Sequence, residues 1–309
     1  MPFRLVTRSD FDGLVCAALL TELGLIDDIA FVHPKDMQDG LVEITERDIT
    51  TNLPYVAGAH LVFDHHLSET VRNGRHDNHV IDPEADSAAR VVFDHYGGSE
   101  AFPAISEEMM RAVDQADSAR YSLEEILAPQ GWTLLNYLMD ARTGLGRFRE
   151  FRISNYDLMM QLIPACRTLG IEEILALPDV VERVELYRDQ AALHTDQLRR
   201  CTRLEGEVAV LDLREEPVIH AGNRFMVYAL FPQATVSIHL MWGKGRQNTV
   251  LAVGKSILDR SNPVSVGELM LAHGGGGHRN AGTCQVPHEQ TDATVAEVVA
   301  ALNAQSVPA

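Results

Sequence analysis

Residues 3–23, FRLVTRSDFDGLVCAALLTEL, join a short apolar run to a longer one through a polar turn. The segment 3–7 predicts a buried strand, and 13–23 predicts a helix that ends at Gly24, a residue suited to a helix C-terminus. Similar patterns predict strands at 29–34, 47–54 and 59–66 and a helix at 85–97. Strands that alternate with helices indicate an α/β fold with a largely parallel sheet.

The pattern changes in the second part of the chain. Residues 104–204 look almost wholly helical, and an apolar seam predicts one long amphipathic helix near their end. The seam is Val180, Val184, Tyr187, Ala191, His194, Leu198 and Cys201. Strands are then expected at 207–213, 224–231, 234–242 and 248–257, and helices at 264–273 and 289–303. We therefore predict two domains, 1–195 with a helical extension and 206–309, the second being α+β with mainly antiparallel pairing.

Composition indicates a soluble protein. The chain has 309 residues, 46% hydrophobic and 23% charged. It lacks an apolar run of the ~20 residues that span a membrane, and its N-terminus lacks the apolar segment of a secretory signal, so a cytoplasmic location is expected. The four cysteines form no C-x-x-C pair, which argues against a disulfide framework and a structural zinc site.

The charge balance bears on possible partners. Forty-four acidic residues against 26 Lys and Arg give a formal charge of −18, which repels long duplex nucleic acid. An anionic substrate must therefore be bound locally, by cations, helix ends or a basic patch. The segment 140–154 offers such a patch, although a solvated helix surface is the simpler explanation. Its arginines are Arg142, Arg147, Arg149 and Arg152.

Asp10 and Asp12 follow the first predicted strand. Side chains two apart in an extended segment point to the same side, so these carboxylates can converge on one or two cations. Taken alone, the pair is better explained by a helix start, with Asp12 as the cap and Asp10 in the turn. The motif by itself therefore does not decide between a metal site and a cap.

Asp64, His65 and His66 end a second apolar strand, in LVFDHHLSE (61–69). Polar residues at this edge of a parallel sheet commonly form binding sites. Successive strand residues point in opposite directions, so one histidine is expected to bind a cation and the other a substrate or a carboxylate. Three polar, metal-competent residues in a row have no packing rationale, which favours this interpretation over a pair of surface histidines.

Asp114 and Asp117 lie three residues apart on a predicted helix and therefore share a face. One of them could supply a further carboxylate to a cation. Helix capping by Asp117 and Ser118 is an equal alternative.

Four consecutive glycines stand between an apolar helix and an apolar strand. Glycines are costly to order, so such a run needs a compensating interaction, and a flexible linker would be expected among polar residues instead. Backbone N–H groups of a glycine-rich loop can bind a phosphate, with a following His and Arg adding donors and charge. The predicted substrate-binding residues are Gly274, Gly275, Gly276, Gly277, His278 and Arg279.

Along the chain the motifs are D-F-D-G at 10–13, D-H-H at 64–66, Asp117, and G-G-G-G-H at 274–278. Together they resemble the DHH/DHHA1 phosphoesterase superfamily, and phrases such as FVHPKDMQDG and FDHHLSE most resemble its exopolyphosphatase-related subgroup. The resemblance implies an N-terminal parallel-sheet DHH domain, a smaller C-terminal DHHA1 substrate-binding domain, and two Mn²⁺ or Mg²⁺ ions between them. Such ions activate a water molecule and hold the phosphorus centre.

The resemblance also implies roles for individual residues. Asp10 would hold one cation, and the other would be held by Asp12, His65 and Asp117. A donor set of oxygens with one or two imidazoles suits Mn²⁺ or Mg²⁺.

The remaining roles concern the substrate. His66 would contact the scissile phosphate, Asp64 would orient the histidines, and 274–278 would bind the other phosphates.

Two positions depart from the family pattern. The first motif is usually H-x-D-x-D, but Arg8 stands at its first position and cannot ligate a cation because it stays protonated. Asn52 stands where the family usually has a bridging Asp before D-H-H. If the strand register differs, Asp48 would be the bridging residue instead. We therefore expect one or two bound ions, with Arg8 as a fixed positive charge that replaces the first cation.

The sequence thus predicts a metal-dependent phosphohydrolase, exopolyphosphatase-like, that cleaves phosphoanhydride or phosphodiester bonds at the cleft between its domains. Short polyphosphate or a short oligonucleotide or dinucleotide is the expected substrate, and Arg8, Asp64 and His66 are the expected catalytic residues. Two alternatives stay open: a nanoRNase or cyclic-dinucleotide phosphodiesterase, and a catalytically impaired regulatory protein that binds a phosphate ligand. No membrane partner is expected, and a homodimer stays possible.

Overall fold

The computed structural model describes residues 2–148 and 150–304. They form two compact units, which we call unit 1 (Met1–Arg120 with Pro129–Leu186) and unit 2 (Tyr121–Ala128 with Tyr187–Ala309). The division falls within helix α10 (Pro178–Cys201). The predicted limits, 1–195 and 206–309, place the division later in the chain and remain a proposal. Among the described residues, no helix has both the length and the apolar character needed to cross a membrane.

Unit 1 contains a five-stranded parallel sheet in the order β2-β1-β3-β4-β5. The strands are β1 (Phe3–Thr7), β2 (Ile26–Phe31), β3 (Asp48–Thr51), β4 (Leu61–Asp64) and β5 (His79–Ile81). The predicted α/β class and parallel pairing are confirmed. The sequence did not predict β5, because three residues are too few to show a periodic pattern.

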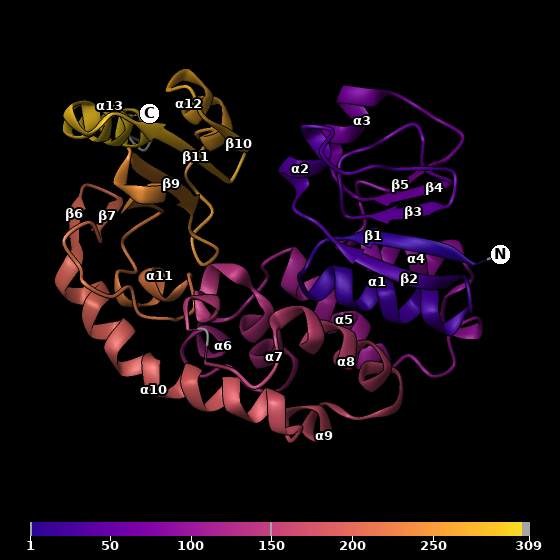
Figure 1. Ribbon diagram of the computed structural model, residues 1–309. Coiled ribbons are helices and arrows are strands. Elements are labelled where there is room, and N and C mark those ends of the chain that lie inside the picture. The colour runs from indigo at the N-terminus through magenta and orange to yellow at the C-terminus, as the bar shows by residue number, and fades with distance from the viewer. Residues whose placement is uncertain (1, 149, 305–309) are drawn as a thin grey trace. The chain divides into compact units, whose positions relative to one another are not determined.

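Helix α1 (Phe11–Glu22) is the central helix of unit 1. Its first ten residues are all buried, and Figure 1 shows it on the same side of the sheet as α4 (Ala88–His95). A helix that is apolar on every side belongs in a core. Its first turn therefore carries one carboxylate, that of Asp12, into the interior, where only 2% of the residue is exposed.

The other helical segments of unit 1 come mostly from the region predicted to be helical. They are α2 (Pro34–Gln38), α3 (Leu67–Asn73), η1 (Gly98–Glu100), α5 (Glu107–Asp117), α7 (Gly131–Met139), η2 (Ala141–Thr143), η3 (Leu145–Arg147), α8 (Asn155–Thr168) and α9 (Ile171–Leu175). Strand β2 ends earlier than the predicted 29–34. The reason is that His33 caps α2, with its side chain accepting from the backbone N–H of Lys35, and Pro34 begins that helix.

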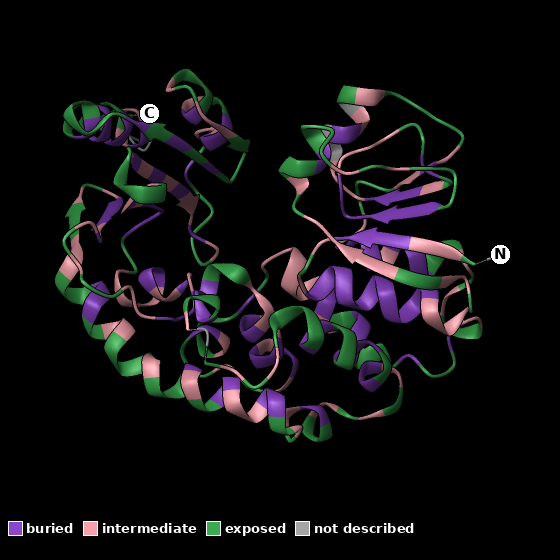
Figure 2. Ribbon diagram, viewed as in Figure 1, coloured by how far each residue is buried: buried purple, intermediate pink, exposed green. Residues whose placement is uncertain are grey.

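Unit 2 contains a six-stranded mixed sheet in the order β10-β11-β9-β8-β7-β6. The strands are β6 (Thr202–Glu205), β7 (Val208–Asp212), β8 (Val236–Trp242), β9 (Thr249–Lys255), β10 (Gly276–His278) and β11 (Ala281–Val286). The pairing is antiparallel except between β7 and β8, so the predicted α+β character is confirmed. Residues of β11 alternate between exposed and buried, whereas the first four residues of β7 are all buried; Figure 2 shows where the buried residues lie.

The helical segments of unit 2 are α6 (Leu123–Leu127), α11 (Met226–Leu230), η4 (Lys244–Arg246), α12 (Val266–Ala272), η5 (His288–Gln290) and α13 (Thr291–Ala304), together with the last part of α10. The main helices on the sheet of unit 2 are α12 and α13, and α6 packs against α11. Residues Val266 and Val295 bring α12 and α13 into one core with the strand residue Val236.

The predicted strand at 224–231 is wrong, because this segment forms α11. The run RFMVYALF is too short and too evenly apolar for periodicity to separate a strand from a helix. Its start is set by Asn223, whose side chain accepts from the N–H of Phe225 and whose carbonyl accepts from that of Met226. The hydroxyl of Tyr228 then donates to the carbonyl of Gly254 on β9, which ties the helix to the sheet.

Candidate metal centre

The candidate site of unit 1 forms at the carboxyl ends of its strands. Asp10 and Asp12 follow β1, and His65 and His66 follow β4, which is separated from β1 by β3. Parallel strands end at the same edge, where side chains from different strands meet. Asp117, the last residue of α5, comes to the same place.

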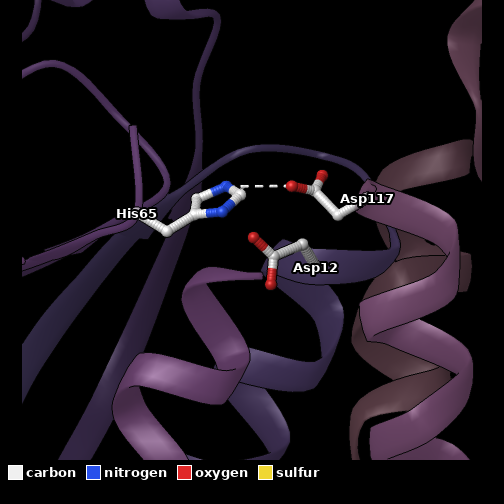
Figure 3. A group of neighbouring side chains, drawn as sticks. All are labelled: Asp12, His65 and Asp117. Carbon is white, nitrogen blue, oxygen red and sulfur yellow. Dashed lines mark ion pairs between the residues drawn. The ribbon is translucent and has the colours of Figure 1, made fainter. Parts of the chain in front are cut away.

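Asp12, His65 and Asp117 form a compact cluster, in which one ligand atom from each residue lies within 4.8 Å of the others. Figure 3 shows the three side chains pointing toward one another. His65 Nε2 lies 2.9 Å from Asp117 Oδ2, and His65 Nδ1 is 3.2 Å from the carbonyl oxygen of Ala85. The Ala85 contact holds the ring so that Nε2 faces the carboxylates, an arrangement common for metal-binding histidines.

The electrostatics of the cluster favour a bound cation. Burial and the negative charge of Asp117 raise the pKa of Asp12 to about 7. Burial opposes the charged form of His65, but the hydrogen bond and charge of Asp117 prevail and raise its pKa to about 9. Burial also opposes ionisation of Asp117, yet the hydrogen bond from His65 holds its pKa below the ordinary value. A divalent cation would relieve the repulsion between the carboxylates.

The donor chemistry fits Mn²⁺ or Mg²⁺. Asp12 Oδ1 accepts from the N–H of Ala89 at 2.7 Å, and Oδ2 accepts from the N–H of Ala88 at 3.1 Å. Each carboxylate oxygen has a second lone pair for a metal. Two carboxylates and one imidazole are hard or borderline ligands of the kind that Mn²⁺ and Mg²⁺ accept.

Arg8 and Asp10 form a separate pair beside this cluster. Arg8 Nε lies 3.1 Å from Asp10 Oδ2, and Asp10 Oδ1 accepts from the N–H of Gly13 at 3.0 Å. Asp10 is thus the N-cap of α1, a role that the sequence had suggested for Asp12. Burial raises the pKa of Asp10, and the charge of Arg8 opposes that rise.

Asp64 connects the two histidines. It is fully buried, and its Oδ1 accepts from the backbone N–H of His65 at 2.9 Å and lies 2.7 Å from His66 Nδ1. The contact fixes the orientation of the His66 ring through Nδ1. The orienting role that the resemblance implies for Asp64 remains a proposal.

Asn52 and Asp48 lie at opposite ends of β3. Asp48 begins the strand, and its Oδ1 lies 2.6 Å from Arg4 Nε, so it is part of an ion pair away from the candidate site. Asn52 follows the carboxyl end with φ +54° and is 1% exposed. Neither atom of its side-chain amide has a hydrogen-bond partner among the residues that the structure describes. Such a buried amide is rare and indicates a missing ligand or water.

Asp114 differs from its neighbour Asp117. Its Oδ1 accepts from the hydroxyl of Ser87 at 2.8 Å, and its Oδ2 accepts from Arg90 Nη2 at 2.6 Å. Asp114 therefore secures the start of α4, and Asp117 is the residue of this pair that reaches the cluster.

Comparison with known proteins identifies the family. No family model and no curated protein matches the chain. A solved structure does: the pGpG-specific phosphodiesterase PggH from Vibrio cholerae shares 58% sequence identity over 98% of this chain and 100% of its own, with a TM-score of 0.86. This chain belongs to the DHH phosphoesterase superfamily. It is accordingly a phosphohydrolase, as the sequence predicted.

Two more distant structures share the fold of this DHH phosphoesterase. An exopolyphosphatase-related protein from Bacteroides fragilis has 14% identity over 96% of this chain and 91% of its own, with a TM-score of 0.53. RecJ of Thermus thermophilus, crystallised with Mn²⁺, has 17% identity over 99% of this chain and 53% of its own, with a TM-score of 0.55.

One arginine of the segment 140–154 interacts electrostatically with the acidic residues Asp10 and Asp117. Arg142 Nε lies 2.7 Å from Asp140 Oδ1, and the charges of Asp140, Asp10 and Asp117 raise its pKa against the effect of burial. Arg152 instead pairs with Asp179, at 3.3 Å. Arg147 lies against Gly144, and Arg149 falls outside the described residues.

The glycine segment, in unit 2, is more ordered than an open loop. The N–H of Gly274 donates to Leu271 and that of Gly275 to Met270, so both groups serve the C-terminus of α12. Residues 276–278 form the edge strand β10, paired only with β11 among the described strands. The exposed Arg279 follows this strand. The N–H of Val266, at the start of α12, also donates to the carbonyl of Arg279, so the exposed Arg279 side chain is the candidate group for an anion in this segment.

Proposed function

We propose that this DHH phosphoesterase hydrolyses the phosphodiester bond of a short linear guanine dinucleotide with a 5′ phosphate, the substrate for which the Vibrio cholerae relative is specific. The observation that carries the proposal is the Asp12, His65 and Asp117 cluster, in a chain so similar over its whole length to a pGpG phosphodiesterase. A dinucleotide joined by a phosphodiester bond is the kind of substrate expected for the nanoRNase alternative that the sequence left open. Polyphosphate becomes the second candidate substrate.

Asp12, His65 and Asp117 would hold one Mn²⁺ or Mg²⁺. Such a cation supplies Lewis acidity toward a phosphoryl oxygen and lowers the pKa of water. Asp10 is the cap of α1 and the partner of Arg8, so we assign it to positioning Arg8 rather than to a second cation. Asn52 remains a candidate ligand through its buried amide oxygen.

The protein's own charged groups would bind and stabilise the phosphate. His66, oriented by Asp64 through Nδ1, would contact the scissile phosphate. The guanidinium of Arg8 has the fork geometry that matches phosphate oxygens, and Arg142 adds a second positive charge beside Asp10 and Asp117. Fixed charges of this kind stabilise the negative charge that develops during phosphoryl transfer. In unit 2, β10 and the exposed Arg279 are the candidate groups for binding a phosphate.

A substrate panel tests the proposal. Wild-type protein with Mn²⁺ is assayed against pGpG, short polyphosphate, a longer oligonucleotide and cyclic di-GMP, with an Asp12→Ala variant as the control. We expect pGpG to have the highest kcat/KM and the variant to lose this turnover. Faster hydrolysis of polyphosphate than of pGpG would refute the dinucleotide assignment.

A further inference from the structure

A cavity of about 160 Å³ lies in unit 1, and its wall includes Ser9, the residue between Arg8 and Asp10 in the sequence. The rest of the wall comes from the end of α7, the segment that follows it, and the start of α8. Asp140 and Ala141 in this wall immediately precede Arg142. Each of the two arginines assigned to the phosphate, Arg8 and Arg142, is therefore next in sequence to a residue of the cavity wall.

The wall is chiefly apolar. Leu138, Leu145, Leu158 and Met159 line it, and each is at most 6% exposed. A substrate made only of phosphates has no group that gains from such a surface. Leucine side chains and a methionine thioether do make favourable contacts with an aromatic ring.

One amide gives the cavity a polar edge. Asn155 Oδ1 accepts from Arg183 Nη2 at 3.2 Å, so the oxygen of this amide is already used. Its Nδ2 lies 3.5 Å from the position that a Cβ on Gly146 would occupy, and Gly146 also lines the cavity. The amide nitrogen therefore lies beside Gly146 at the cavity wall, and its N–H donors match the ring nitrogen or carbonyl acceptors of a purine.

We propose that this cavity binds a nucleobase of the substrate, with the adjoining phosphate at Arg8 and Arg142. A buried cavity of roughly 150 Å³ is known to accept a benzene ring, whereas pockets for drug-sized molecules begin near ~300 Å³. A space of about 160 Å³ with an open side therefore suits one base rather than a whole nucleotide. The inference rests on the proposed function, because it names the part of the dinucleotide that unit 1 would recognise.

Two variants fill the cavity in independent ways. Gly146→Leu is sterically suitable, because the nearest neighbour of the added Cβ is the Asn155 amide at an ordinary contact distance of 3.5 Å and the glycine has no positive φ. Met159→Trp adds bulk from a different element of the wall, helix α8. Met160→Trp is the matched control, since Met160 is the next residue on α8, is 36% exposed and does not line the cavity. Thermal unfolding checks that each variant is folded.

Binding is measured by calorimetry with two probes, GMP and ribose 5-phosphate, which share a phosphate but not a base. We expect Gly146→Leu and Met159→Trp to weaken GMP binding at least tenfold, and Met160→Trp to leave it unchanged. Ribose 5-phosphate should bind the wild type and Gly146→Leu equally. Failure of GMP to bind the wild type, or equal GMP affinity in folded Gly146→Leu, overturns the proposal.

The same protein is then assayed with pGpG, which separates this inference from the proposed function. Loss of GMP binding in the two variants, in a protein that does not hydrolyse pGpG, would support the base site and reject the substrate assignment. Normal hydrolysis of pGpG with an unchanged KM in Gly146→Leu would support the substrate assignment and reject the base site.

Discussion

The guanidinium of Arg8 lies 3.1 Å from the carboxylate of Asp10, and the same carboxylate caps α1 through the N–H of Gly13. A fixed positive charge therefore stands where the family pattern places a histidine. Both oxygens of Asp10 have protein partners. The cluster of Asp12, His65 and Asp117 has the donor atoms that a cation needs. The pair supports the proposal that one cation and the Arg8 guanidinium take the place of the two cations that the family resemblance implies.

The first prediction concerns the number of bound cations. Wild-type protein is expected to bind one Mn²⁺ per chain, measured by mass spectrometry after gel filtration and by the uncoupled six-line signal in electron paramagnetic resonance. Arg8→His combined with Asn52→Asp restores an imidazole and a carboxylate, so this double variant is expected to bind two coupled ions. Two tightly bound ions in the wild type would contradict the prediction.

The second prediction separates the two carboxylates of α5. Asp117→Asn should lower kcat/KM by more than the ~10- to 100-fold that loss of an outer partner of a metal ligand costs, because it removes a proposed ligand. Asp114→Asn is the matched control, since Asp114 bonds Ser87 and Arg90 instead. The control should keep its cation and most of its activity, with a lower melting temperature as its main effect. Equal losses of cation binding in both variants would count against Asp117 as a ligand.

The third prediction concerns the glycine segment. A Cβ on Gly275 would lie 2.0 Å from the carbonyl oxygen of Thr283, so Gly275→Ala should destabilise unit 2 by about 1–3 kcal/mol. A Cβ on Gly276 has no neighbour within 4 Å, so Gly276→Ala should keep the wild-type melting temperature. If the edge strand binds a substrate phosphate, Gly276→Ala should nevertheless raise the KM for pGpG several-fold. An unchanged KM would remove β10 from the binding site.

The fourth prediction is a pH dependence of stability. Burial of His239 and the positive charge of Arg224 lower the pKa of this imidazole to about 4. In the unfolded chain its pKa is ~6.5, so between these values the unfolded state takes up a proton that the folded state does not. Stability is therefore lost as the pH falls from about 6.5 toward 4, by about 1–2 kcal/mol at pH 5 for this group alone.

His239→Gln should remove this part of the acid sensitivity. The measurement is chemical denaturation of both proteins at pH 7 and pH 5, and the quantity compared is the change in unfolding free energy. An equally large loss in the variant would show that other groups cause the acid sensitivity.

Much of the fold was predictable because it depends on local patterns. The segment 3–23 predicted β1 and α1, and the long apolar seam predicted α10. Errors occurred where an apolar run was short: 224–231 contains helix α11, whose start is held by the hydrogen bonds that Asn223 accepts and whose Tyr228 bonds to β9. The strand β5 was not predicted because it, too, is short.

The sequence by itself determined the order of the motifs, the α/β class and the departure at Arg8, because these are properties of residue type and spacing. Only the tertiary structure decided which aspartate caps α1 and which reaches the cluster. Asp12 finds its N–H donors at Ala88 and Ala89, more than seventy positions away, and Asp117 meets His65 from a different element. Such partners become neighbours only when the strands of a parallel sheet end at one edge, and no local pattern encodes that distance.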